Sequence, residues 1–173
     1  MKKSVVLTCF CIFILFSPSV LSGQSLVSLD GALTRAVTEF ASKVQGRTKI
    51  VIVEIEAPLN EVSIFLIDEL SSHLVSSGIF IVLERGNAIE AVNAEHQFQM
   101  SGLVSDESAV GIGQYLGAKV VITGSLQRFA EFSQLRLRAI DVQTGQLLTM
   151  HTARIHSDDP LLGSIMKPLD IKP

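Results

Sequence analysis

Three short runs of consecutive apolar residues, rich in valine and isoleucine, limit the folds open to this chain. The runs are 49–55 (KIVIVEI), 79–83 (IFIVL) and 120–123 (VVIT). Strands that are apolar on both sides, without alternation, are typical of parallel sheets that helices cover on both faces. Segments with helical spacing separate the runs, and right-handed crossovers then make the three strands parallel neighbours.

Four helices are expected around these strands. Apolar residues recur at helical spacing in 28–45, 61–77, about 87–97 and 105–116. Ser28 and Asn60 are expected to cap the first two helices, because short polar side chains accept hydrogen bonds from the free N–H groups of a first turn.

The pattern changes after the third apolar run. In residues 135–142, leucines first alternate with arginines, as in a strand with one buried face. Residues 143–145 (QTG) are a typical hairpin turn because glycine tolerates positive φ, and residues 146–156 return as the partner strand. We therefore predict an α/β fold, a mixed sheet of about five strands (three parallel, then an antiparallel hairpin) with helices packed on it.

The N-terminus has the three parts of a secretory signal peptide. A basic start (1–3) precedes an apolar run (5–16), a proline break and small or aliphatic residues at 20–22. The apolar run is shorter than the about 20 residues that a membrane-spanning helix needs. We predict a signal peptide over residues 1–22 and export to the periplasm or the periplasmic face of the outer membrane. A leader retained as an anchor is the alternative.

The mature chain is expected to be one domain, residues 25–156, followed by an extended or loosely docked tail over residues 157–173, which contains three prolines. Both cysteines, Cys9 and Cys11, lie in the leader, so the mature chain has no disulfide and no thiolate site. They also come too early in the apolar run to carry a lipid anchor. Any membrane association is therefore expected to be peripheral.

Charge excludes one class of partner. Loss of Lys2 and Lys3 with the leader leaves 12 basic and 17 acidic residues, a net charge of −5. A mildly acidic chain without basic clusters is a poor match for nucleic acid, whose phosphates attract lysine and arginine. We expect no nucleic-acid partner.

The sequence contains no motif of bond-making chemistry. Four histidines are scattered, and His151 and His156, five apart on one predicted strand, point to opposite faces. Without a mature cysteine or an HExxH motif, we expect no metal and no cofactor. The glycines at 111 and 113 precede a strand instead of following one, so we assign them to close helix packing and not to a phosphate loop. We predict no catalytic residue and no enzyme; a hydrolase would need a serine or a carboxylate pair brought together by the fold.

One edge of the predicted sheet is a candidate for binding a ligand or a partner. Glu84 and Arg85 end the second parallel strand, where open α/β sheets often bind ligands. Asp106 and Glu107, at the start of a helix, are expected to come near the same edge. The alternative is a solvated loop ion pair and a favourable charge at a helix N-terminus.

Four phrases in register resemble one protein family. They are 83–85 (LER), 95–104 (EHQFQMSGLV), 115–125 (YLGAKVVITGS) and 137–145 (LRAIDVQTG). Their order and spacing are similar to the curli-secretion (CsgG) family and its relatives, which include penicillin-binding protein activators of the LpoB type and TolB-associated or flagellar envelope proteins. The similarity runs from about residue 28 to residue 155.

This resemblance implies a non-catalytic periplasmic module that works through protein contacts. Curli channels insert membrane-spanning hairpins of about 9–11 residues a strand, for which this chain has no room, so we do not expect a channel. LpoB-type activators carry a lipidated cysteine and a long linker, and neither is evident here. We expect envelope proteins, and the chain itself as a homo-oligomer, as partners. A periplasmic small-ligand-binding protein that uses the strand edge is the alternative function.

Overall fold

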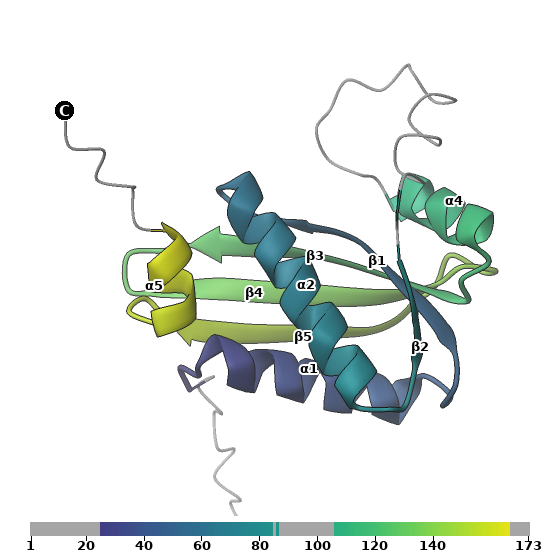
Figure 1. Cartoon of the computed structure of the whole chain (residues 1–173), viewed down its shortest axis with the longest axis horizontal. Coiled ribbons are helices and arrows are strands. Elements are labelled where there is room, and N and C mark those ends of the chain that lie inside the picture. The colour runs from purple at the N-terminus through teal and green to yellow at the C-terminus, as the bar shows by residue number, and fades with distance from the viewer. Residues whose placement is uncertain (1–24, 85, 87–105, 167–173) are drawn as a thin grey trace, which may run out of the picture.

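A computed structural model describes residues 25–84, 86 and 106–166. These residues form a five-stranded sheet in the order β2-β1-β3-β4-β5, with helices packed against it (Figure 1). The strands are β1 (Lys49–Glu56), β2 (Ile81–Leu83), β3 (Val120–Arg128), β4 (Phe132–Asp141) and β5 (Leu147–His156). The predicted α/β class with a mixed sheet is confirmed.

The strand pairing follows the predicted topology. β1 lies between β2 and β3 and is parallel to both, whereas β4 is antiparallel to β3 and to β5. The turn between β4 and β5 has Gly145 at φ 68°, the left-handed conformation that the sequence predicts there. Three parallel strands followed by an antiparallel hairpin are thus confirmed.

Four helices lie in the described residues. They are α1 (Leu29–Lys43), α2 (Asn60–Ser76), α4 (Asp106–Leu116) and α5 (Pro160–Met166). The Ser28 side chain caps α1 by accepting a hydrogen bond from the Gly31 N–H at 3.1 Å, as predicted. Asn60 does not cap α2, because the extended residue Leu59 takes that position and its carbonyl accepts the first helical bonds. The signal peptide and the helix expected at 87–97 fall outside the described residues.

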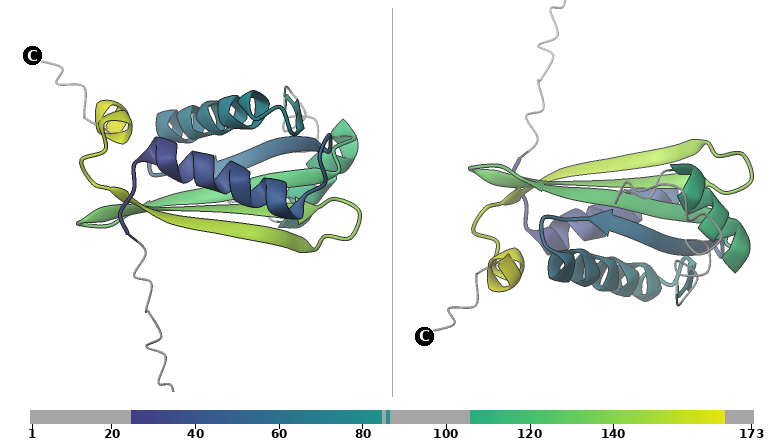
Figure 2. Two further views of the ribbon diagram at one scale, coloured as in Figure 1. Left: turned by 90° about the horizontal axis from the view of Figure 1, so that it is seen from below. Right: turned by 90° about the horizontal axis from the view of Figure 1, so that it is seen from above.

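The two faces of the sheet are covered unequally. One face packs against α1, α2 and α5, through a core that includes Phe40, Leu70 and Leu137. The other face packs only against α4 among the described helices, through a smaller core that includes Val53, Ile112 and Val121. Figure 2 shows α1 and α2 together on one side of the sheet, whereas α4 lies at one end.

The prediction of an extended tail from residue 157 is wrong for residues 160–166, which form α5. The buried carboxylate of Asp159 accepts hydrogen bonds from the N–H groups of Leu161 (3.0 Å) and Leu162 (3.2 Å) and so caps this helix. Pro160, one of the three prolines of the predicted tail, occupies the first helical turn, where a missing N–H costs nothing. Leu162 joins the larger core, so the folded unit extends past residue 156.

Among the described residues, no helix combines the length and the apolar character needed to cross a membrane.

Candidate functional site

The face of the sheet opposite α1 and α2 carries a band of polar side chains that no described helix covers. The register aligns them in rows across the strands, such as Glu56, Ser125, Arg136 and Thr152. Each is half-buried or exposed. We call this surface the open face; its residues are Glu54 and Glu56 of β1, Thr123 and Ser125 of β3, Gln134, Arg136 and Arg138 of β4, and Met150, Thr152 and Arg154 of β5.

The first turn of α4 limits the open face at one end. Arg138 makes a bidentate ion pair with Asp106, with both N–O distances at 2.7 Å. Two parallel charge-assisted hydrogen bonds fix the relative orientation of guanidinium and carboxylate. The pair therefore connects the start of α4 to the middle of β4, although both side chains keep partial exposure to solvent.

A shallow pocket of about 190 Å³ lies between α4 and the open face. A Cβ atom on Gly124, which lines it, would come within 2.6 Å of the Arg136 carbonyl oxygen, so only glycine allows β4 this close. The lining side chains are carboxylates, hydroxyls and guanidiniums, with acids on β1 and arginines on β4. The lining residues are Glu54, Glu56, Asp106, Thr123, Gly124, Ser125, Arg136 and Arg138.

Two phenylalanines and an arginine form a cluster at the opposite end of the open face. The rings of Phe129 and Phe132 stack with centroids 4.9 Å apart. The guanidinium carbon of Arg154 lies 5.0 Å from the Phe132 centroid, a cation–π contact. Because Phe129 is 43% exposed, this cluster presents aromatic surface to solvent.

Three of the four residues selected from the sequence lie in the described part of the chain. Glu84 follows β2 and is exposed, and Glu107 is exposed on α4. Arg85 lies outside the described residues. Asp106 lines the pocket, but its partner there is Arg138 of β4. The assignment of Glu84, Arg85 and Glu107 to a binding edge stays a prediction.

Sequence reasoning missed the arginines of β4. The alternation in residues 135–138 indicated the strand, and the same alternation places both arginines on the face opposite the buried leucines. The available signal for this surface was therefore a row of arginines on one side of a predicted inner strand.

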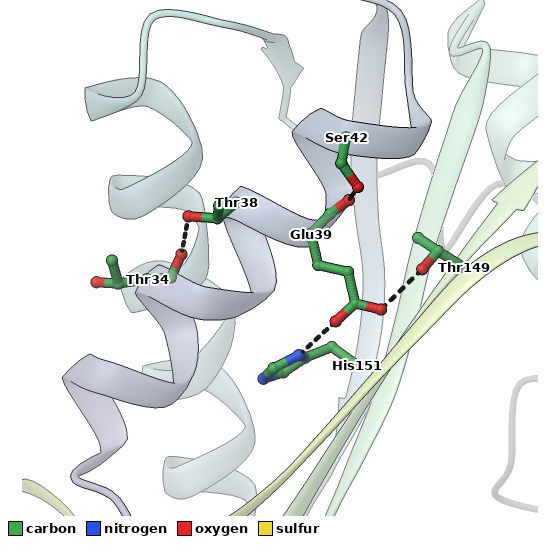
Figure 3. Close-up of polar contacts among 6 residues, drawn as sticks. All are labelled: Thr34, Thr38, Glu39, Ser42, Thr149 and His151. Atoms are coloured by element: carbon green, nitrogen blue, oxygen red, sulfur yellow. Dashed lines mark hydrogen bonds and ion pairs between the residues drawn. The ribbon is translucent and has the colours of Figure 1, made fainter. Parts of the chain in front are cut away.

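A polar cluster on the covered face joins α1 to β5 (Figure 3). Nδ1 of the buried His151 lies 2.8 Å from Oε2 of Glu39, and the Thr149 hydroxyl donates to Oε1 of the same carboxylate at 3.1 Å. A carboxylate only accepts, so Nδ1 is the donor. Nε2 of His151 is buried and has no hydrogen-bond partner among the residues that the structure describes. The cluster connects α1 to β5. His156 points to the opposite face of the sheet from His151, as predicted.

The two glycines assigned to close helix packing differ. A Cβ on Gly113 would lie 2.5 Å from Val121 and 2.7 Å from Val142, which confirms that this glycine serves close packing of α4. The same assignment is wrong for Gly111, because a Cβ there would meet no atom within 4 Å. Within the described ranges, no group of three or more histidine, cysteine or acidic residues is placed to hold a metal ion.

Comparison with known proteins assigns the family. The family model described as curli production assembly/transport component CsgG matches residues 20–134, more than half of the chain. The chain belongs to the CsgG family. No curated protein matches this CsgG-family chain.

Solved structures agree on the fold of this CsgG-family chain. It is similar to the LpoB C-terminal domain from Salmonella enterica at 16% identity and a TM-score of 0.62, covering 74% of this chain and 98% of that one. The LpoB C-terminal domain from Escherichia coli gives 17% identity and a TM-score of 0.61, with the same coverage. The NMR structure of E. coli LpoB gives 13% identity and a TM-score of 0.59, covering 89% of this chain and 81% of that one. At these identities the likeness establishes the fold, which is that of an LpoB-like domain.

Proposed function

We propose that this protein is a non-enzymatic interaction module of the bacterial cell envelope, which either assembles with itself or regulates a cell-wall synthesis or secretion machine. The open face is its docking surface, and the observation that carries the proposal is a sheet face that no described helix covers. A sheet face of charged, hydroxyl and apolar side chains offers both hydrogen-bonding and apolar contact, as the rims and cores of protein interfaces do.

Family membership and the leader support the place of action. CsgG is described as a curli production assembly/transport component, and the fold is shared with LpoB domains. The sequence of residues 1–22 favours export. We infer action in the periplasm or at the periplasmic face of the outer membrane.

The pocket supports an interaction role more than catalysis. Its lining includes no histidine or cysteine. Its volume of about 190 Å³ is also below the roughly 300–1,000 Å³ of typical small-molecule sites. A pocket of this size fits a partner's side chain. Its position between α4, the carboxyl end of β1 and the middle of β3 keeps a small-ligand-binding function as the second candidate.

The test is photo-crosslinking in living cells. A photoreactive amino acid at Thr152, on the edge strand β5 beside Arg136, should capture a specific envelope protein or a second copy of the chain. The same group at Thr38, which is exposed on α1, is the matched control. Capture from Thr38 but not from Thr152 would refute the open face as the docking surface.

The small-ligand alternative is tested by heat denaturation of the purified protein against a panel of amino acids, sugars and nucleotides. A stabilisation that Asp106→Asn abolishes would favour that alternative.

A further inference from the structure

Two arginines of the open face have no acidic partner among the residues that the structure describes. Within the described parts of the chain, no carboxylate lies within salt-bridge distance of Arg136 or Arg154, whereas Arg138 is paired with Asp106. Both unpaired arginines are exposed. Two exposed cations without an ion pair to a described residue are available for an anionic contact from outside.

The register brings these two charges near each other. Arg154 is directly opposite Gln134, and Arg136 is the next residue of β4 on the same face, so the arginines are diagonal neighbours. Diagonal positions in a sheet are about 7–8 Å apart. The Arg154 guanidinium lies over Phe132, on the other side of Gln134 from Arg136. A partner segment with two carboxylates can therefore place one on each arginine and gain charge-assisted hydrogen bonds at both.

The surroundings of the arginines have the composition of an interface centre. Arg154 lies over Phe132, which stacks on Phe129, and Met150 of the same face is 47% exposed. Arginine, phenylalanine and methionine are enriched at protein interfaces, and lysine is depleted. The open face, as defined by its residues, contains no lysine.

Acidic residues lie on the β1 side of the open face, and they favour one position of an acidic partner. Glu54 and Glu56 lie on β1, across β3 from Arg138 and Arg136. They would repel an acidic partner that extended over β1. Charge thus directs such a partner to β4 and β5.

We propose that the open face binds an acidic segment of another protein, with carboxylates on Arg136 and Arg154 and apolar side chains on Phe129 and Phe132. This inference rests on the proposed function and adds the chemistry of the partner.

Binding of defined peptides measures the chemistry directly. The probes are a blocked short peptide of glutamates around one phenylalanine and one leucine, and the same peptide with glutamine in place of glutamate. They are titrated into the ¹⁵N-labelled protein, expressed from its full-length gene. We expect the glutamate peptide to shift the amides of residues 134–136 and 152–154, and the glutamine peptide to bind at least about tenfold more weakly.

Charge reversal provides the matched control. Arg136→Glu and Arg154→Glu should each lower the affinity for the glutamate peptide by about tenfold or more. Arg35→Glu changes the charge equally at an exposed position of α1 and should leave binding unchanged. Equal binding of the two peptides, equal effects of all three reversals, or shifts confined to other surfaces would overturn the proposal.

The same variants, carrying the photoreactive group at Thr152, separate this inference from the proposed function. Capture of another protein that Arg136→Glu abolishes and Arg35→Glu preserves supports both. Capture that neither Arg136→Glu nor Arg154→Glu reduces, or capture of a second copy alone, overturns the acidic partner but leaves an interaction module. No capture from the open face refutes the proposed function itself.

Discussion

The two faces of β4 are built from alternate residues of one strand but have opposite surroundings. Leu135, Leu137 and Ala139 are buried in the core beneath α1 and α2. Arg136 and Arg138, between them in the sequence, lie on the open face. Burial of apolar surface stabilises a fold by about 25 cal/mol per Å², whereas exposed charges contribute little. The covered face of β4 therefore contributes more to the stability of the fold than its open face does.

Leu137→Ala should give the largest change. The side chain is fully buried, and its truncation leaves a cavity, so we expect the free energy of unfolding to fall by about 3 kcal/mol. Urea denaturation followed by circular dichroism measures it, since the chain has no tryptophan for fluorescence. A loss below about 1 kcal/mol would contradict the division between the faces, because buried leucines rarely cost so little.

Asp159→Ala tests how α1 and α5 are fixed to the covered face. Asp159 caps α5 and also accepts a hydrogen bond from the Leu29 N–H of α1 at 2.9 Å. Loss of these bonds at two helix N-termini should cost about 2 kcal/mol. Its neighbour Asp158 is exposed, so Asp158→Ala should change the melting temperature little. Equal effects of the two variants would show that Asp159 is not the connection.

Two glycines of α4 test the smaller core under the end of the open face. Gly113→Ala forces a methyl group against Val121 and Val142 and should destabilise the protein by about 1–2 kcal/mol. Gly111→Ala meets no atom within 4 Å and should stabilise by up to about 1 kcal/mol, because alanine favours helix. Thermal denaturation of both variants checks the opposite signs. A stabilising Gly113→Ala would mean that α4 does not pack closely on the sheet.

Asp141 is the last residue of β4, and its contribution to stability depends on pH. Hydrogen bonds, first from the Thr144 backbone N–H and also from the Thr144 hydroxyl and the Gln143 N–H, hold its pKa below the usual 3.8. A carboxyl whose pKa is lower in the folded state than in the unfolded state stabilises the fold at pH values above its unfolded-state pKa. This contribution is lost as the pH falls through the folded-state pKa. Asp141→Asn should therefore lower stability at pH 7 and reduce the slope of stability against pH below 4. Parallel pH profiles of variant and wild type would show that the turn does not use the charge.

The sequence was sufficient for the strands because their signal is local. Continuous apolar runs predicted β1 and β3, and alternation predicted β4, each of which the structure confirms. The helix at 160–166 was missed because its cap depends on the burial of Asp159, and its neighbour Pro160 suggests a break when the sequence is considered alone.

The candidate site was less predictable, because it depends on pairing between strands. Asp106 was selected from its place at a helix start, but its partner Arg138 is 32 residues away and meets it only through the register of β4 on β3. The proximity of Arg136 and Arg154 likewise follows from the β4–β5 register. The charges and spacings along the sequence do not show which of these side chains lie close together.

Arg136→Ala should give the smallest change in stability, and this separates the two faces most sharply. The side chain is exposed and has no ion pair among the described residues, so we expect the free energy of unfolding to stay within about 0.5 kcal/mol of wild type. Its neighbour Leu137 points to the other face of the strand and supplies the comparison in the same denaturation series. A loss above about 1 kcal/mol would mean that Arg136 supports the fold. The loss of partner capture in Arg136→Glu would then be a consequence of instability, and binding would have to be measured at a temperature where both proteins are folded.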